Sequence, residues 1–459
     1  MFQTVSLPLW VLVLVLAFAA VTFASHFLFP SVRWFFRARA ERALARLNAR
    51  LDRPIELFKL AARQDMIARL VYDPQVLQAV TEHARDTGIP GAVALEEAKH
   101  YAREIVPAFS ASIYFGVAIR LARWLSRALY RVEITRPDLG PSAVDPSATV
   151  ILVMNHRSNM DYVLITWLIA DRSALSYAVG EWAHVWPLSA LIRASGAYFI
   201  RRKTRKTLYR RVLARYVQIT TEEGVTQGVF PEGGLSLDGR VGPAKMGLLS
   251  YIVSGYDTER RDVVFLPVGL AYDRVLEDAV LTEAQAAGEA EGLGGTGPRR
   301  FRGRIGAITV FVGEFLWQRL RRAAPPYGTA AAGFGKPLSL RAYFEANPGA
   351  TVQALGAHLM GEIERAVPVV PVPLVAAVLR SGAADRLAAL SAMRAALLAA
   401  EALLHLGPQD AEVLAAGLAL LRRRGVLDAS DQLHPEQARL LAFYAAPVEQ
   451  RLGLAQEEA

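Results

Sequence analysis

The chain has 459 residues, of which 53% are hydrophobic and 21% are charged, and its formal net charge at pH 7 is +9. This length exceeds one average domain and predicts a catalytic domain flanked by further helical segments. The absence of cysteine excludes disulfides, cysteine nucleophiles and cysteine-ligated metals. The positive charge predicts an anionic partner such as a lipid surface or a phosphorylated substrate, and no nucleic-acid partner is expected because no recognisable nucleic-acid-binding motif is present.

An uncharged, mostly apolar run extends from Leu7 to Ala24 and predicts one helix long enough to cross a bilayer. The alternative is a cleaved signal peptide, but the preceding residues MFQTVS contain no Lys or Arg. Four arginines follow the run: Arg33, Arg37, Arg39 and Arg42. By the positive-inside rule, we expect a single crossing of the inner (cytoplasmic) membrane with the catalytic body in the cytoplasm.

Four regions follow from these patterns. We expect a transmembrane anchor at 1–30, an N-terminal amphipathic helical region at 31–135, a catalytic domain at 136–345 and a C-terminal helical region at 346–459. Within the second region, residues 113–130 alternate apolar side chains with arginines. That helix either packs on the catalytic domain or lies partly in the membrane interface.

Short β-branched runs alternate with helical patterns in the catalytic region, which predicts an α/β fold with a mixed sheet flanked by helices. In such a sheet, the chemistry is expected at the strand ends. A stretch at 288–306 changes from acidic to Gly-rich to basic and predicts a mobile surface loop. The expected strands are 148–154, 175–179, 228–230 and 263–268, and the expected helices include 162–170 and 204–223.

The segment NHRSNMDY directly follows the first predicted strand and contains His156 and Asp161. A hydroxyl that attacks a thioester carbonyl must lose its proton, and a histidine supported by a carboxylate can accept it near neutral pH. A structural histidine in a loop is the alternative.

Two further segments carry polar groups suited to a phosphorylated ligand. In GAYFIRRKTRK, the guanidiniums of Arg201 and Arg202 could bind phosphate oxygens in bidentate fashion, although a solvated helix start would have the same composition. In FPEGGLSLDGR, Glu232 precedes two glycines in a tight turn, where backbone N–H groups can approach a ligand.

Taken with VVFLPVGLAYDRV, these segments occur in an order that resembles the glycerolipid acyltransferase family, and especially its bacterial membrane-bound glycerol-3-phosphate acyltransferases. The resemblance covers about residues 93–380. It implies His156 as the general base and Asp161 as its orienting carboxylate, with no metal, no cofactor and no covalent enzyme intermediate. Acyl-CoA or acyl carrier protein would be the co-substrate, and backbone N–H groups would stabilise the oxyanion.

The same resemblance implies a set of substrate-binding residues. Arg201 would be a principal ligand of the acceptor phosphate with Arg202 nearby, and the other members would line the acceptor pocket or its rim. The full set is Arg157, Ser158, Arg201, Arg202, Phe230, Glu232, Gly233, Gly234, Ser236 and Pro267.

This chain departs from the family pattern after the Glu-Gly-Gly turn, where Leu235 and Leu237 stand at positions that are usually basic. Arg240 and Lys245 could supply the missing phosphate contact, or the acceptor could be a different lipid headgroup. The expected reaction is acylation of the sn-1 hydroxyl of glycerol 3-phosphate at a lipid bilayer. The alternatives are acylation of lysophosphatidate or another lysolipid, and a catalytically silent membrane-binding protein on the same fold.

Overall fold

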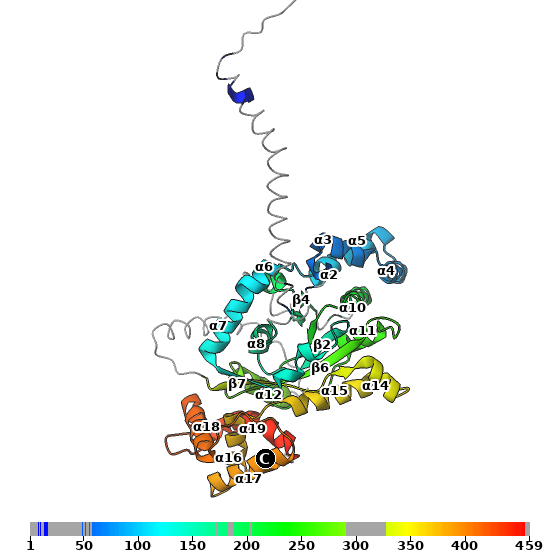
Figure 1. Cartoon of the computed structure of the whole chain (residues 1–459). Coiled ribbons are helices and arrows are strands. Elements are labelled where there is room, and N and C mark those ends of the chain that lie inside the picture. The colour runs from blue at the N-terminus through cyan, green and yellow to red at the C-terminus, as the bar shows by residue number, and fades with distance from the viewer. Residues whose placement is uncertain are drawn as a thin grey trace, which may run out of the picture. The chain divides into compact units, whose positions relative to one another are not determined.

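The computed structural model describes residues 55, 57–170, 173–180, 188–201, 204, 206–290 and 327–454, together with positions 8, 10, 13–16, 48 and 51. The chain divides into two compact units, Met1–Pro54 and Ile55–Ala459. The sheet and the helices around it belong to the second unit (Figure 1). No helix formed by the described residues is long and apolar enough to cross a membrane. Most of the predicted transmembrane run, Leu7 to Ala24, lies outside the described residues, so the anchor stays a prediction.

The second unit is built on one mixed sheet with the strand order β1-β7-β6-β2-β5-β3-β4, and β8 pairs with β6. Neighbouring strands from β6 to β4 run parallel, whereas β7 and β8 are antiparallel to β6. The strands are β1 (Arg131–Thr135), β2 (Thr149–Met154), β3 (Ser176–Val179), β4 (Tyr198–Phe199), β5 (Gln227–Val229), β6 (Val263–Tyr272), β7 (Thr329–Phe334) and β8 (Leu338–Ser339).

The central strands are apolar on both faces because helices cover both sides of the sheet. In β2, Val150, Leu152 and Met154 join one hydrophobic cluster, while Ile151 and Val153 join the other. This alternation follows from the two-residue period of a strand. The mixed sheet flanked by helices confirms the fold class expected from the sequence.

One face of the sheet is covered by helices whose buried side chains share a cluster with Ile151 and Val153 of β2. They are α3 (Arg63–Val71), which the short helix α2 (Leu57–Leu60) precedes, α4 (Pro74–Thr87), α5 (Gly91–Ile105), α10 (Thr207–Glu222), α11 (Gly247–Ser254), α14 (Leu340–Ala346) and α15 (Val352–Ala366).

The other face carries α8 and the C-terminal helices, whose buried side chains share a cluster with Val150, Leu152 and Met154 of β2. The elements on this side or adjoining it are α6 (Ala111–Ile113), the π-helical turn η1 (Tyr114–Ala118), α7 (Ile119–Leu129), α8 (Met160–Leu168), α9 (Leu188–Ala194), α12 (Asp278–Ala290), α16 (Pro371–Arg380), α17 (Arg386–Ala399), α18 (Asp410–Arg424) and α19 (Ala438–Arg451). Short 3-10 turns, η2 (Pro137–Leu139), η3 (Pro141–Ala143) and η6 (Pro435–Gln437), complete the described elements.

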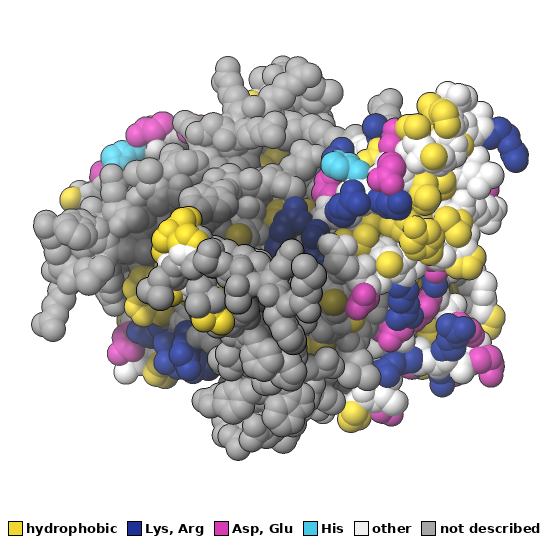
Figure 2. Space-filling view, turned by 90° about the horizontal axis from the view of Figure 1, so that it is seen from above, with side chains coloured by type: hydrophobic (Ala, Val, Ile, Leu, Met, Phe, Trp, Pro, Cys, Tyr) yellow, Lys and Arg dark blue, Asp and Glu magenta, His cyan; other side chains and the backbone are white. Residues whose placement is uncertain are grey.

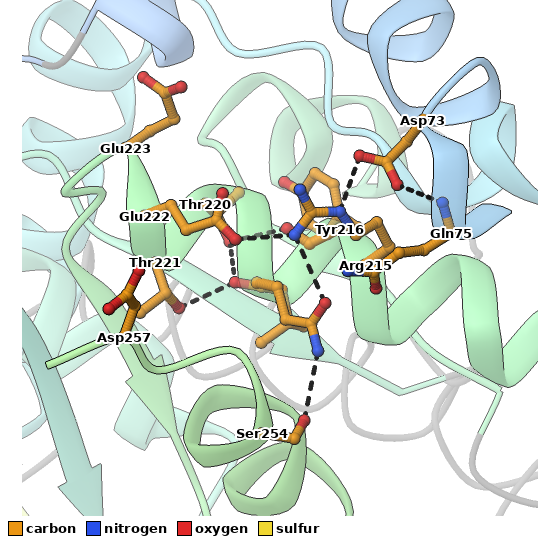
Figure 3. Close-up of polar contacts among 12 residues, drawn as sticks. Asp73, Gln75, Arg215, Tyr216, Thr220, Thr221, Glu222, Glu223, Ser254 and Asp257 are labelled. Carbon is orange, nitrogen blue, oxygen red and sulfur yellow. Dashed lines mark hydrogen bonds and ion pairs between the residues drawn. The ribbon is translucent and has the colours of Figure 1, made fainter. Parts of the chain in front are cut away.

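An ion-pair network joins the start of α4 to α10 (Figure 3). Arg215 on α10 donates from Nε to Asp73 at 2.8 Å and from Nη1 to Glu222 at 2.7 Å. Asp73 also caps α4 by accepting a hydrogen bond from the backbone N–H of Gln75 at 3.0 Å. One carboxylate therefore both starts α4 and holds it against α10.

The predicted strands agree with β2, β3, β5 and the first part of β6, which continues to Tyr272. Two corrections concern the other expected segments. The predicted loop at 288–306 begins inside α12, which runs to Ala290, and its remaining residues lie outside the described part. Four strands, β1, β4, β7 and β8, were not expected from the sequence; β4 and β8 have only two residues each, and β1 and β7 pair with segments distant in sequence.

Candidate active site

The carboxyl ends of β2, β5, β3 and β4 point to one edge of the sheet, since these strands run parallel. His156 follows β2, Glu232 follows β5 and Arg201 follows β4. Neighbouring strands lie about 4.8 Å apart, so the end of β4 is about 14 Å from that of β2. The topology thus brings these three predicted residues to the same edge.

His156 and Asp161 form a buried pair, with side chains 1% and 0% exposed. Nδ1 of His156 lies 2.9 Å from Oδ2 of Asp161. The same carboxylate oxygen accepts backbone N–H groups of Arg157 at 2.7 Å and Ser158 at 3.0 Å, and its other oxygen accepts the hydroxyl of Tyr272 at 2.7 Å. Asp161 is thus fixed by donors from both sides and can hold the imidazole in one orientation with Nδ1 protonated.

Aromatic rings fix the plane of the imidazole. The ring of Phe230 stacks on that of His156, with centroids 4.1 Å apart and planes inclined by 26°. Tyr162 contacts the imidazole edge-on at a centroid distance of 5.4 Å. The predicted pocket residue Phe230 is therefore in direct contact with the predicted base.

The Glu-Gly-Gly turn is attached to both backbone groups of His156. Oε1 of Glu232 accepts the backbone N–H of His156 at 3.1 Å, and the backbone N–H of Ser236 donates to the carbonyl of His156 at 2.9 Å. Burial raises the pKa of the Glu232 carboxyl to about 7, although the N–H groups of His156 and Gly242 and the guanidinium of Arg157 act in the opposite direction. The Glu232 side chain thus joins the turn after β5 to the loop after β2.

The glycines allow the turn to close. Gly233 has φ +67°, and its N–H donates to the carbonyl of Phe230 at 3.0 Å. Gly234 follows it and is half-buried. The hydroxyl of Ser236 lies 2.8 Å from the carbonyl oxygen of Arg240 and accepts the N–H of Gly239 at 3.1 Å. The structure thus engages the predicted substrate contact Ser236 in the internal hydrogen bonds of the turn.

Three other predicted substrate contacts make internal interactions. The buried guanidinium of Arg157 donates to the carbonyl of Gly239 and lies over the ring of Phe443, and burial lowers its pKa. The hydroxyl of Ser158 donates to Glu277 at 2.7 Å. Pro267 lies within β6, opposite Val153 of β2, and not at the carboxyl end of the strand. These contacts support the loop after β2 and the sheet.

Arg201 is 36% exposed and pairs with Glu104 of α5. Its Nε and Nη2 donate to the two carboxylate oxygens at 2.8 and 2.6 Å, and this hydrogen bonding raises the pKa of Arg201. Its backbone N–H donates to the hydroxyl of Tyr209 at 3.0 Å. Lys and Arg side chains gather near the middle of the face seen from above, with acidic side chains beside them (Figure 2). Arg202 lies outside the described residues.

The Acyltransferase family model matches residues 118–271, which include His156, Asp161, Arg201 and Glu232. The chain is 30% identical over 307 residues to a glycerol-3-phosphate acyltransferase of Pseudomonas entomophila (strain L48), which covers 65% of this chain and 34% of that relative. It is 28% identical over 292 residues to the enzyme of the same name from Actinobacillus succinogenes, covering 62% of this chain and 33% of the relative. Residues 118–271 therefore form an acyltransferase domain, and the chain is similar to glycerolipid acyltransferases. It spans about a third of the length of these curated relatives.

Among solved structures, the chain is similar to the 1-acyl-sn-glycerophosphate acyltransferase PlsC from Thermotoga maritima, with a TM-score of 0.33 and 19% identity. That similarity covers 55% of this chain and 76% of the other.

Sequence reasoning did not reveal Tyr272 and Glu277 as parts of the site. Both come from the end of β6 and the segment that follows it, yet they bind Asp161 and Ser158, more than a hundred residues away. Tyr272 lies in the LAYDRV segment that carried part of the resemblance, whereas Glu277 lies beyond that segment. Among the described residues, no group of three or more His, Asp or Glu side chains is placed to hold a metal ion. The metal-free reaction stays a prediction.

Proposed function

We propose that this chain transfers a fatty acyl group from a thioester donor to the sn-1 hydroxyl of glycerol 3-phosphate, in phospholipid synthesis. The observation that carries the proposal is the buried His156–Asp161 pair, in which Nδ1 of the imidazole faces a carboxylate held by three further donors. The names of the matched relatives support glycerol 3-phosphate as the acceptor.

In the proposed reaction, Nε2 of His156 takes the proton of the acceptor hydroxyl as its oxygen attacks the thioester carbonyl. A C–O bond forms, the C–S bond breaks, and the imidazolium returns the proton to the leaving thiolate. Asp161 stabilises the imidazolium while it carries the proton. The acyl group passes directly to the acceptor, so no covalent enzyme intermediate forms. Arg201, with Arg202, binds the acceptor phosphate, and the donor is acyl-CoA or acyl carrier protein.

The experiment offers purified full-length chain several acceptors with a labelled acyl-CoA or acyl carrier protein donor. We expect a product from glycerol 3-phosphate whose acyl group is at the sn-1 position. Transfer only to lysophosphatidate or another lysolipid would assign the alternative reaction, which Leu235 and Leu237 leave open. Thioester turnover no faster than that of a His156→Ala chain would contradict an acyltransferase function.

We propose that the enzyme works at a bilayer. A line of exposed apolar side chains runs from the end of α6 through η1 and along α7, at helical spacings of four, four and three residues. Its members are Ile113, Val117, Leu121 and Trp124, which are 37%, 52%, 44% and 48% exposed. Arg120 and Arg127 are exposed beside this line. Apolar side chains flanked by arginines on one helix suit the interface of an anionic membrane.

The cysteine-free chain allows a direct test of this contact. A Leu121→Cys variant is labelled with a polarity-sensitive dye and mixed with anionic vesicles, and Leu398→Cys on α17, which is 59% exposed, serves as the control. We expect the emission of the label at position 121 to shift to the blue while that of the control stays unchanged. Equal responses at both positions would contradict the proposal.

We also propose that the N-terminal run crosses the inner membrane once and that the catalytic body faces the cytoplasm. In right-side-out vesicles, external protease should leave the body intact, and it should digest the body once the vesicles are opened. Digestion of the body in sealed vesicles would contradict this topology.

A further inference from the structure

Among the described residues, the buried carboxylate of Glu277 hydrogen-bonds only to the catalytic loop, residues 155–161, which contains His156 and Asp161 of the proposed reaction. It lies between β6 and α12, and the residue is 2% exposed. Its oxygens accept the hydroxyl of Ser158 at 2.7 Å, the backbone N–H of Asn159 at 3.1 Å and the side-chain Nδ2 of Asn159 at 3.0 Å. All three donors are neutral groups of the loop that joins His156 to Asp161.

Burying a carboxylate against neutral donors costs free energy, and in the described part of the chain no Lys or Arg side chain is hydrogen-bonded to Glu277 to compensate for the lost hydration. Burial indeed raises the pKa of Glu277, and the nearby charge of Asp161 acts in the same direction. A glutamine would fill the same space without a buried charge. The presence of a glutamate therefore needs a reason beyond packing.

Ser158 connects the two buried carboxylates. Its backbone N–H donates to Asp161 at 3.0 Å, its hydroxyl donates to Glu277, and the same hydroxyl accepts the backbone N–H of Met160 at 3.1 Å. Asn159 stands at the N-cap of α8, but its side chain makes no cap hydrogen bond and goes to Glu277 instead. The start of α8, which carries Asp161, is thus fixed to Glu277.

The segment at the end of β6 holds the catalytic loop at two more points. Asn155 exchanges hydrogen bonds with the backbone of Leu270 at 2.7 and 2.9 Å, and Tyr272 donates to Asp161. Residues 270–277 therefore hold the catalytic loop from Asn155 to Asp161.

We propose that Glu277 is a positioning residue of the acyl transfer, which orients the start of α8 toward Asp161 and whose negative charge favours the His156 imidazolium. This inference rests on the proposed role of His156 as the base. Glu277 acts through Ser158, Asn159 and Asp161 and touches no reacting atom. The other charged or titratable groups among the described residues that face the pair and Glu277 are Tyr130, Arg157, Tyr162, Glu232 and Tyr272.

The test compares Glu277→Gln with Asp278→Asn. Asp278 is the adjacent residue and is equally buried, but it pairs with Arg424 at 2.8 Å and with Tyr444 at 2.6 Å, away from the catalytic loop. We expect Glu277→Gln to lower kcat about tenfold or more with acceptor KM within about twofold of wild type. Removing the negative charge disfavours the imidazolium of His156. The acidic limb of the pH profile of kcat should therefore move to lower pH by roughly half a unit or more. In Asp278→Asn, thermal stability should fall, while the acidic limb of the pH profile of kcat should stay in place.

A second measurement does not depend on acyl transfer. The imidazole of His156 is titrated by NMR in isotopically labelled wild type and Glu277→Gln, with His156→Ala to assign its signals. We expect a lower pKa of His156 in Glu277→Gln. A folded Glu277→Gln variant with unchanged kcat, unchanged pH profile and unchanged pKa of His156 would overturn the inference. A wild-type chain that transfers no acyl group would overturn the proposed function, and the titration would then decide on Glu277.

If Glu277→Gln does not fold, Ser158→Ala serves as the second variant, because it keeps the carboxylate of Glu277 and removes one of its donors. This variant should also have a lower kcat than wild type. Unchanged kcat in that variant would also count against the inference.

Discussion

Glu104 and Arg201 form a bidentate ion pair in which both carboxylate oxygens accept from the guanidinium, at 2.8 and 2.6 Å. A phosphate would use the same two donors. In the proposed function, the acceptor phosphate therefore competes with Glu104 for Arg201, unless it binds the remaining face of the guanidinium.

The first prediction concerns this pair. Arg201→Ala should raise the acceptor KM about tenfold or more and leave the donor KM nearly unchanged, because charge-assisted hydrogen bonds to the phosphate are lost. Arg201→Lys should restore binding only in part, since an ammonium lacks the planar fork. Steady-state kinetics with both substrates varied measure this. An unchanged acceptor KM in a folded Arg201→Ala chain would assign the phosphate to other cations, with Arg240 and Lys245 as the next candidates.

The second prediction tests the competition. Glu104→Gln should lower the acceptor KM roughly two- to fivefold, the range expected for release of a half-exposed ion pair. Glu97→Gln on the same helix is the control, since Glu97 contacts Tyr101 and His83 and not Arg201. A higher acceptor KM in Glu104→Gln would show that Glu104 orients Arg201 for the phosphate and does not compete with it.

The third prediction concerns the base. His156→Ala should lower kcat by at least about a hundredfold, as expected for loss of general-base catalysis, while circular dichroism shows a folded chain. His358→Ala, in which a 42% exposed imidazole is removed, should keep wild-type activity. Near-wild-type turnover of His156→Ala would refute the assignment of the base.

The fourth prediction follows from the buried carboxyl of Glu232. Burial raises its pKa from 4.5 to about 7, so between these pH values the folded chain holds a proton that the unfolded chain has lost. The contribution of Glu232 to the free energy of unfolding therefore falls as the pH rises from about 4.5 to about 7 and is constant above that. Glu232→Gln lacks this dependence.

The stability of Glu232→Gln relative to wild type should therefore increase with pH across this window, by at most about 3 kcal/mol. Urea unfolding at several pH values measures the difference. For the exposed Glu259→Gln control, the difference should be flat. A flat difference for Glu232→Gln as well would show that Glu232 keeps an ordinary pKa in the fold.

The fifth prediction concerns the contact between α19 and the Glu-Gly-Gly turn. Gly239 has φ +87°, and an added Cβ would lie 2.0 Å from the carbonyl oxygen of Phe443. Gly239→Ala should therefore lower the free energy of unfolding by about 2 kcal/mol or more. Gly349 is the control, because it has φ +82° and no atom lies within 4 Å of an added Cβ. Gly349→Ala therefore tests the backbone strain alone and should lower the free energy of unfolding by about 1 kcal/mol. Equal losses in the two variants would show that α19 yields at this contact.

Local sequence patterns were sufficient for the central elements. The fully apolar TVILVM run and the apolar run before Tyr272 are typical of strands that are covered on both faces, and they became β2 and β6. His156 and Asp161 were also accessible from the sequence, because both lie in one loop after a recognisable strand. The five-residue spacing places Asp161 in the first turn of α8, close enough to reach the imidazole.

Only the tertiary structure decided what most of the polar side chains do. The resemblance implied Arg157, Ser158 and Ser236 as substrate contacts, which stays a prediction, and in the folded chain these side chains hydrogen-bond to Gly239, Glu277 and Arg240. A local pattern states which donors and acceptors a segment carries. It does not state which distant strand or helix supplies their partners, and burial obliges each polar group to find one. The sequence by itself therefore determined the core strands and the candidate pair of His156 and Asp161. The sheet order decided that Tyr272 reaches Asp161 and that Glu277 reaches Ser158, because it sets β6 directly beside β2.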